Sequence, residues 1–214
     1  ITGDIIDNER GIEPCARAVS ELKARLGIYA VLGNHDHYDY GGLETFAALI
    51  GRSFFAKRKN RVDLLKKALA DVGCRVLTNE SLVLERGRDR IAVIGLADPV
   101  TGHADGERAF ANVDSAPLRI LLAHSIDVLR KLGGRRVDLA LGGHTHGGQF
   151  SIPFLGPPPL LAHSRLGRRY VAGLARYRDT ITYTSRGMGE GKFFPFRFLC
   201  PPEAVLFEIR GRRS

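Results

Sequence analysis

Apolar positions recur at helical spacing in two stretches of the chain. Between residues 14 and 26 they repeat every three or four positions, with Pro14 in the first turn and Gly27 just past the end. The same periodicity returns over about residues 61–72. A shorter helix is expected at 126–132. The pattern therefore predicts three helices, of which the first two are amphipathic.

Short apolar runs bounded by glycine and polar residues predict the strands. Those at 75–79, 82–87 and 89–97 are joined by short turns, which favours antiparallel pairing between neighbours. Together with the helices, this pattern favours a layered α/β protein with two sheets over a purely parallel sheet. Further strands are expected within 27–34, 119–125, 137–144, 180–187 and 203–210.

Polar side chains of similar chemistry follow several of these apolar runs. Loops that leave the carboxyl ends of strands build the sites of α/β proteins, so these side chains should lie close together. Carboxylate, amide and imidazole donors suit Mn, Fe, Zn or Co, whereas Ca and Mg favour more oxygen ligands. The sequence therefore predicts a transition-metal centre. Its candidate residues are Asp4, Asn34, His35, Asp36, His124, His144 and His146.

A histidine that follows one strand is more often a polar residue at a loop edge than a metal ligand. Here several strand ends carry histidine, and Gly-Asp and Gly-Asn pairs end two others, so the repetition favours ligation. The neighbouring glycines lack a Cβ and allow the backbone to crowd a small metal centre. These are Gly3, Gly33, Gly142 and Gly143.

Four motifs, in this order, resemble those of the calcineurin-like metallophosphoesterases. They are GDxxD at 3–7, GNHD at 33–36, the histidine of LLAHS at 121–125, and GHTH at 143–146. The chain looks most like a bacterial phosphodiesterase branch that shares GHTHGGQ and C-terminal motifs, here SRGMG and PFRFLCPPE. That branch includes enzymes that act on the UDP-diacylglucosamine intermediate of lipid A synthesis.

The resemblance implies one metallophosphoesterase domain over residues 1–214, folded as an αββα sandwich of two mixed sheets flanked by helices. It implies a dinuclear centre of divalent Mn, Fe, Zn or Co at the strand ends, with a metal-bridging hydroxide as the attacking group. Asp4 would bridge both metals, and His146 would bind the first of them. The second metal would take Asn34, His124 and His144. His35 would be the catalytic acid, oriented by Asp36, and Asp7 would have a supporting role similar to that of Asp36.

In the family, the first metal also takes ligands from an Asp-x-His motif, and this sequence contains none. We therefore expect a chain that lacks its first strand and that motif, with an incomplete first-metal site and low activity. The expected location is bacterial, either cytoplasmic or at the cytoplasmic membrane, held peripherally or anchored through a missing N-terminal segment. The oligomeric state is left open.

Other segments suggest contacts with substrate or lipid. His37 and Arg186 are candidate substrate-binding residues, because His37 follows the metal loop and the guanidinium of Arg186 suits phosphate. The apolar segment 153–161 precedes a basic one, and 54–61 places aromatic beside basic residues. Each could contact an anionic membrane or a lipid-linked substrate, or could simply be a packed loop or surface segment.

Charge and composition leave other functions open. A net charge of +9 suits any acidic partner, so a nuclease and a non-catalytic metal-binding or nucleic-acid-binding module are alternatives to the phosphoesterase. The chain has no tryptophan and few aromatic residues for base stacking, so nucleic acid is the weaker hypothesis. Three widely spaced cysteines indicate neither a disulfide framework nor a zinc-thiolate site.

Overall fold

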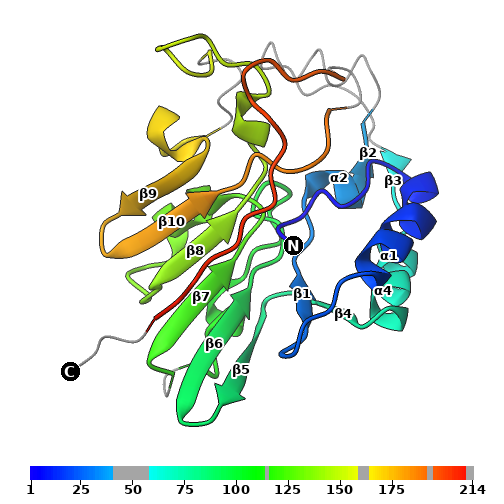
Figure 1. Cartoon of the computed structure of the whole chain (residues 1–214). Helices are drawn as coiled ribbons and strands as arrows, with labels where there is room; N and C mark the ends of the chain where they lie inside the picture. The colour runs from blue at the N-terminus through cyan, green and yellow to red at the C-terminus, as the bar shows by residue number, and fades with distance from the viewer. Residues whose placement is uncertain (41–57, 114–115, 159–163, 192–194, 211–214) are drawn as a thin grey trace.

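The structure, a computed structural model, describes residues 1–40, 58–113, 116–158, 164–191 and 195–210. Its largest element is a six-stranded sheet (Figure 1). The strands are, in spatial order, β5 (Glu80–Arg86), β6 (Asp89–Gly95), β7 (Leu118–Leu122), β8 (Leu139–Gly142), β10 (Thr180–Thr184) and β9 (Gly173–Tyr177). The four central strands are parallel, and the two edge strands pair antiparallel to them.

Alternating side chains of the central strands enter two different cores. On β6, Ala92 and Ile94 face one core, and Val93 faces the other. On β7, Leu121 faces the same core as Ala92 and Ile94, and Leu122 faces the same core as Val93. Because successive residues of a strand point to opposite faces, both faces of the sheet are covered.

One face of the six-stranded sheet packs against a smaller sheet. The smaller sheet pairs β1 (Ile28–Ala30) in parallel with β4 (Cys74–Val76), and a parallel bridge from Thr2 to Val31 extends it. Beyond it lie α1 (Ile12–Ser20) and α4 (Val62–Asp71), whose buried side chains include Val19, Leu65 and Leu69. A 3₁₀-turn, η1 (Glu9–Gly11), precedes α1.

The opposite face of the large sheet is covered by short helices. These are α5 (Gly106–Ala109) and η2 (Ile126–Lys131), a 3₁₀-helix whose first turn is capped by the Ser125 side chain. The layers therefore run helix, sheet, sheet, helix, and the predicted α/β sandwich is confirmed. Shorter elements are α2 (Asn34–His37), β2 (Tyr38–Asp39) paired with β3 (Arg58–Lys59), η3 (His146–Gly148) and η5 (Arg168–Tyr170).

The first predicted helix is shorter than its apolar pattern suggested. It ends at Ser20, whose hydroxyl donates to the carbonyl of Arg17 at 2.7 Å and competes with continued helical bonding. Leu22 and Leu26 are 50% and 42% exposed, so the pattern beyond Ser20 does not face the core. Across the described part of the chain, no helix is both long and apolar enough to cross a bilayer.

Two strand predictions are also wrong. Residues 75–79 were expected to pair antiparallel with the strand that follows, but β4 pairs in parallel with β1 in the smaller sheet. The chain therefore crosses between the sheets before β5. Residues 203–210 form no strand. Their apolar residues include Leu206, which is 96% exposed, so they lack the buried face that would support one.

Candidate metal centre

Four of the predicted ligands come together at the carboxyl ends of parallel strands. His124 follows β7 and His144 follows β8 in the large sheet. Asp4 and Asn34 follow the bridged segments of the smaller sheet. Parallel strands end at the same edge, so the two sheets present their loops to a common space. The predicted convergence of these four residues is observed.

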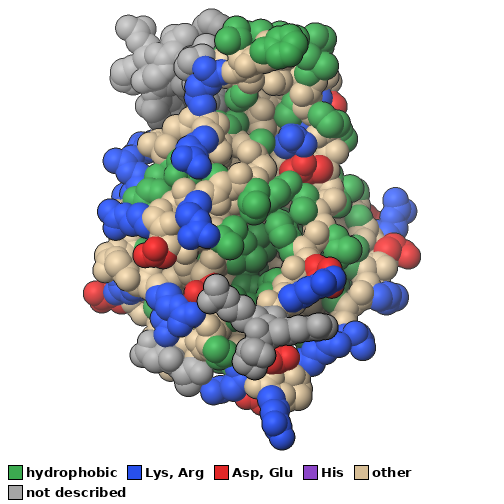
Figure 2. All heavy atoms as spheres, turned by 60° about the vertical axis from the view of Figure 1, so that its left-hand side comes forward, with side chains coloured by type: hydrophobic (Ala, Val, Ile, Leu, Met, Phe, Trp, Pro, Cys, Tyr) green, Lys and Arg blue, Asp and Glu red, His purple; other side chains and the backbone are tan. Residues whose placement is uncertain are grey.

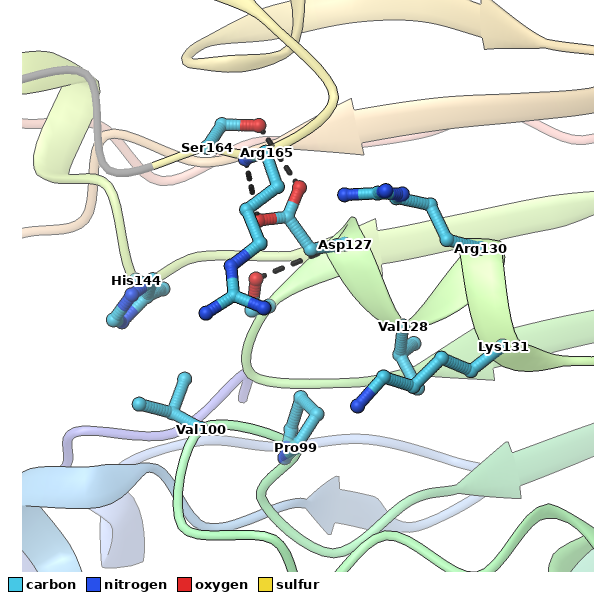
Figure 3. A pocket seen from close by; sticks show the side chains of 10 residues that line it. Pro99, Val100, Asp127, Val128, Arg130, Lys131, His144, Ser164 and Arg165 are labelled. Carbon is cyan, nitrogen blue, oxygen red and sulfur yellow. Dashed lines mark hydrogen bonds between the residues drawn. The ribbon is translucent and has the colours of Figure 1, made fainter.

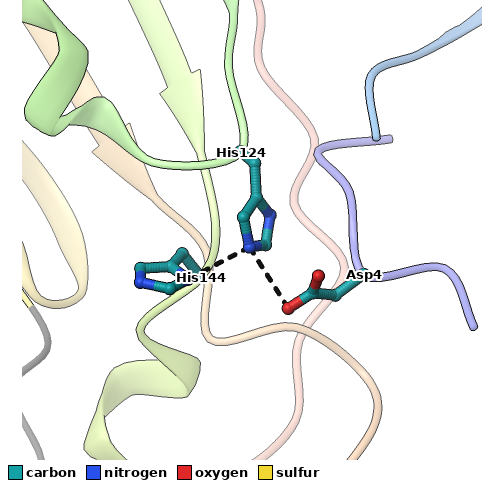
Figure 4. A group of neighbouring side chains, drawn as sticks. All are labelled: Asp4, His124 and His144. Carbon is teal, nitrogen blue, oxygen red and sulfur yellow. Dashed lines mark hydrogen bonds and ion pairs between the residues drawn. The ribbon is translucent and has the colours of Figure 1, made fainter. Parts of the chain in front are cut away.

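The donor atoms of this cluster surround one imidazole nitrogen. His124 Nε2 lies 3.2 Å from Asp4 Oδ2 and 3.1 Å from His144 Nδ1 (Figure 4). The amide oxygen of Asn34 is also 3.2 Å from His124 Nε2. One ligand atom each from Asp4, His124 and His144 all lie within 4.8 Å of one another, a grouping that could hold a metal ion.

The cluster has the chemistry of a cation site. His124 Nδ1 lies 2.9 Å from the carbonyl oxygen of Thr2, which can only accept, so Nδ1 carries the hydrogen. In the neutral ring, Nε2 then turns a lone pair toward the Asp4 and Asn34 oxygens. The Asn34 amide nitrogen donates to the Tyr40 hydroxyl at 3.3 Å, which keeps its oxygen facing the cluster. Lone pairs that converge in this way require a proton or a cation between them.

Two glycines allow the loops to approach this closely. A Cβ on Gly33 would lie 2.3 Å from Asp4 Oδ1 and 2.6 Å from His124 Cε1. On Gly3 it would lie 2.6 Å from the Gly33 nitrogen, and the φ of Gly3 is +85°. The expectation that glycine lets the backbone crowd the centre is confirmed at these two positions. By contrast, a Cβ on Gly142 would first meet Ile126, a residue of η2.

Burial and mutual charge set the protonation of the cluster. Burial would raise the pKa of Asp4, but the charge and hydrogen bond of His124 outweigh it and hold that pKa well below its usual range. Burial would lower the pKa of His124, but the same Asp4 carboxylate raises it to about 9. Without a metal, His124 therefore carries a proton at Nε2 at neutral pH, in the position that a cation would take.

Metal affinity should consequently rise with pH. A metal must displace the His124 proton, so below pH 9 its apparent affinity should increase about tenfold per pH unit, while Asp4 stays ionised throughout. Titration calorimetry with Mn²⁺ at several pH values, in buffers of different ionisation enthalpy, would measure the affinity and the released proton. A constant affinity between pH 6.5 and 8.5 would contradict this assignment.

His146 lies beside this cluster but outside the convergent group. Burial, the largest effect, lowers its pKa to about 4, so its ring is neutral at pH 7. Its carbonyl accepts from Cys200 Sγ at 3.3 Å and from Arg197 Nη1 at 3.3 Å, which fastens the turn to the C-terminal segment. His144 and His146 have φ of 70° and 51°, a region that few non-glycine residues adopt. The surrounding contacts hold this strained turn in place.

His35 is oriented by Asp7, and the prediction that Asp36 orients it is wrong. His35 Nδ1 lies 2.8 Å from Asp7 Oδ1. The Asp36 carboxylate is fully buried and accepts three backbone N–H groups, from Ile5 at 2.7 Å, Ile6 at 2.9 Å and Gly33 at 2.8 Å. A carboxyl group three residues into the turn is placed to cap backbone amides. Asp36 therefore ties the Asp4 loop to the Gly33 loop.

Asn60 is a residue of this region that the sequence pattern did not indicate. Its side-chain amide donates to the carbonyl of His35 at 2.9 Å and to that of Asp7 at 3.2 Å. It is buried, and it fixes the backbone on both sides of the His35–Asp7 pair. An asparagine before a predicted helix normally suggests a cap, so only the tertiary contact reveals this role.

The two candidate substrate-binding residues lie in different surroundings. His37 packs against His103 with ring centroids 5.1 Å apart, and both line a cavity of about 430 Å³ beside α4. Arg186 pairs with Glu203, with 2.8 Å between Nη1 and Oε2. Their roles toward substrate stay predictions. Of the segments predicted to contact lipid, residues 54–57 and 159–161 lie outside the described residues.

Comparison with known proteins supports the same interpretation of these motifs. Residues 1–148 match the family described as calcineurin-like phosphoesterase. The chain is 32% identical over 219 residues to the uncharacterized metallophosphoesterase YkuE of Bacillus subtilis, covering 98% of this chain and 66% of that protein. It is 32% identical over 147 residues to phosphodiesterase YaeI of Escherichia coli, covering 68% and 51%. It is 27% identical over 243 residues to UDP-2,3-diacylglucosamine pyrophosphatase LpxG of Chlamydia trachomatis, covering 96% and 71%.

These relatives are bacterial, and the chain spans about two thirds of the length of the Bacillus proteins that it matches. The region matched by the family contains Asp4, Asn34, His124 and His144, the four residues that converge in the structure. The family match covers more than half of the chain. The chain therefore belongs to the calcineurin-like phosphoesterase family.

Proposed function

We propose that this chain is a metal-dependent phosphoesterase that hydrolyses phosphodiester or pyrophosphate bonds. The observation that carries the proposal is the convergence of Asp4, Asn34 and His144 on His124 Nε2, with the His35–Asp7 pair beside it. The backbone N–H of His35 donates to Asp4 Oδ1 at 2.9 Å, so the candidate acid and the metal cluster are joined directly.

The proposed cofactors are two divalent ions of Mn, Fe, Zn or Co. Asp4, Asn34, His124 and His144 would hold one of them, and Asp4 with His146 would reach toward the other. The set of Asp4 and His146, which corresponds to the first metal of the family, is incomplete, so we expect weaker binding there. When bound, the ions would polarise the phosphoryl oxygens and activate water for attack. The mixed oxygen and nitrogen donors suit these metals better than Ca or Mg.

In this proposal, His35 protonates the leaving group. Burial opposes a charge on its ring, but the hydrogen bond to Asp7 and the charges of Asp4 and Asp7 raise its pKa above the usual value. With Nδ1 directed at Asp7, the proton available for transfer sits on Nε2. Asp7 thus favours the charged form of the His35 ring and fixes the direction in which it donates.

Hydrolysis of bis-p-nitrophenyl phosphate with Mn²⁺ tests this proposal. His35→Asn should lower kcat by about 10²–10⁴, the usual contribution of a general acid, and Asp7→Asn by about 10–100. Because His35 acts protonated, activity should fall as pH rises through its raised pKa. Removing the Asp7 charge lowers that pKa, so the fall should move to lower pH.

The matched control is Asp71→Asn, which changes an exposed carboxylate paired with Lys67. It should leave the rate and the pH profile unchanged. Absence of Mn²⁺-dependent hydrolysis by the unchanged protein would overturn the proposed function. Full activity of His35→Asn would overturn the assignment of the acid alone.

We further propose that the substrate is lipid-linked and is met at an anionic membrane surface, at the bacterial cytoplasmic membrane. Phe154 is 108% exposed and Leu155 is 64% exposed, on a loop at the end of the molecule that carries the strand-end loops (Figure 1). Hydrophobic side chains gather at this end (Figure 2). Arg168 lies against the same loop, with Nη2 3.6 Å from the position of a Cβ on Gly156. Apolar tips beside basic residues suit anionic lipid.

Vesicle sedimentation tests the membrane contact. The double variant Phe154→Ser, Leu155→Ser should lose most of its binding to phosphatidylglycerol vesicles, because the two apolar side chains would no longer enter the interface. Leu174→Ser is the control, since Leu174 is 70% exposed on the edge strand β9. Equal binding of both variants, or equal binding to neutral and anionic vesicles, would contradict the proposed contact.

A further inference from the structure

A pocket of about 690 Å³ opens beside the metal cluster (Figure 3). His144, a candidate ligand, forms part of its wall. The rest comes from the loop after β6, from η2, and from the segment that begins at Ser164. Its volume is in the range of pockets that bind small molecules, so it can take more than a single phosphate group. The lining residues are Pro99, Val100, Ser125, Asp127, Val128, Arg130, Lys131, His144, Ser164 and Arg165.

Cationic side chains dominate the polar part of this pocket. Arg130, Lys131 and Arg165 line it from two separate segments, and all three are exposed. Among the described residues, none of the three side chains has a hydrogen bond or ion pair. Arg130 and Lys131 are in η2, and Arg165 enters from the opposite wall (Figure 3).

Asp127, the one acidic residue in this lining, accepts hydrogen bonds from the segment that begins at Ser164. Asp127 Oδ1 accepts from the Ser164 hydroxyl at 3.0 Å and from the Leu166 nitrogen at 3.1 Å. Asp127 Oδ2 accepts from the backbone nitrogen of Arg165 at 2.7 Å. The carboxylate therefore fixes the segment that carries Arg165 and makes no ion pair with the three cationic side chains. The pocket keeps a net positive lining next to the metal cluster.

We infer that this pocket is a subsite for a second phosphate group of the substrate, beside the phosphate that is cleaved at the metal centre. This inference rests on the proposed function. Guanidinium groups pair with phosphate oxygens in a fork and form strong charge-assisted hydrogen bonds. The apolar wall of Pro99, Val100 and Val128 can receive the group attached beyond that phosphate. The subsite therefore favours diphosphate diesters over simple phosphodiesters.

The two substrate classes should respond differently to loss of the subsite. A simple diester reaches only the metal centre, whereas a diphosphate diester also contacts the cationic wall. Removing Arg165 and Lys131 should therefore weaken binding of the diphosphate class and leave the simple diester unaffected. A residue that merely shaped the metal centre would affect both classes equally.

The test uses UDP-N-acetylglucosamine, a soluble diphosphate diester, as a competitor of bis-p-nitrophenyl phosphate hydrolysis with Mn²⁺. In the double variant Arg165→Ala, Lys131→Ala, its inhibition constant should rise at least about tenfold, because the charged hydrogen bonds of both side chains to the second phosphate are lost. The KM for bis-p-nitrophenyl phosphate should stay within about twofold. Arg165→Lys should recover part of the affinity, since it restores the charge without the fork.

Arg88→Ala is the matched control, because Arg88 lies in the exposed turn between β5 and β6 at the other end of the strands (Figure 1). It should change neither constant. An unchanged inhibition constant in the double variant, or an equal rise in both constants, would overturn the subsite. If the unchanged protein hydrolyses neither compound, the proposed function fails. Calorimetric binding of UDP-N-acetylglucosamine to the Mn²⁺-loaded protein and the double variant then still tests the subsite.

Discussion

Gly33→Ala should leave the protein folded but lower its Mn²⁺ affinity and its hydrolysis of bis-p-nitrophenyl phosphate by about 100-fold or more, the effect of misplacing a reacting group by about 1 Å. The added Cβ would stand 2.3 Å from Asp4 Oδ1 and 2.6 Å from His124 Cε1. Both side chains would have to move, and both belong to the donor cluster. The loss should therefore appear first in metal binding.

This effect is steric and involves no backbone strain. Gly33 has φ of −110° and ψ of −177°, extended values that alanine adopts freely. The matched control is Gly189→Ala, because a Cβ on Gly189 meets no atom within 4 Å. Equilibrium dialysis with Mn²⁺ and circular dichroism would separate lost binding from lost folding. Mn²⁺ affinity in Gly33→Ala equal to that of the unchanged protein would refute the crowding argument.

Asp36→Ala should lower the free energy of unfolding by about 3–5 kcal/mol, because it leaves two buried N–H groups and one part-buried N–H group without an acceptor. Burial and the charge of Asp4 raise the pKa of Asp36 to about 7, although its three N–H donors favour the charged form. Asp36→Asn should have a smaller effect. Its oxygen can serve Ile5 and Ile6, but its amide NH₂ then faces the Gly33 nitrogen.

Urea unfolding of the metal-free protein measures this loss directly. Asp71→Ala is the control, because it removes an exposed carboxylate, and it should change the free energy by about 0.5 kcal/mol or less. Asp36→Ala should also weaken Mn²⁺ binding, since the loops of Asp4 and Gly33 lose their common anchor. If Asp36→Ala were as stable as Asp71→Ala, the carboxylate would not be the tie between these loops.

The sequence predicted which of the candidate side chains lie together, because their positions follow from strand topology. Apolar runs ending in His124, His144 and Asn34 mark carboxyl ends of strands, and parallel packing brings such ends together. The partner of His35 was harder to predict. Asp36 is adjacent in sequence, but α2 turns its side chain toward backbone amides and leaves His35 facing Asp7. Sequence adjacency does not reveal this direction.

The other differences between the predicted and the observed structure also have local causes. The periodic apolar positions beyond Ser20 suggested a longer helix, but Leu22 and Leu26 meet no packing layer. The strand at 74–76 has the same apolar pattern as the strands that follow it, yet it belongs to the other sheet. Its pairing partner, β1, is separated from it in the chain by α4, so the pairing is not visible between sequence neighbours. The contacts of Asn60 and Asp127 with distant backbone had no sequence pattern that could indicate them.

The hydrogen bond between the Thr2 carbonyl and His124 joins residues 122 positions apart. Closing so long a loop is entropically unfavourable until most of the intervening chain has condensed, so the donor cluster belongs to the contacts of high contact order that form late. Formation of the candidate metal centre would therefore mark the end of folding. In stopped-flow refolding, Mn²⁺ binding should coincide with the slowest phase and should not precede formation of the large sheet.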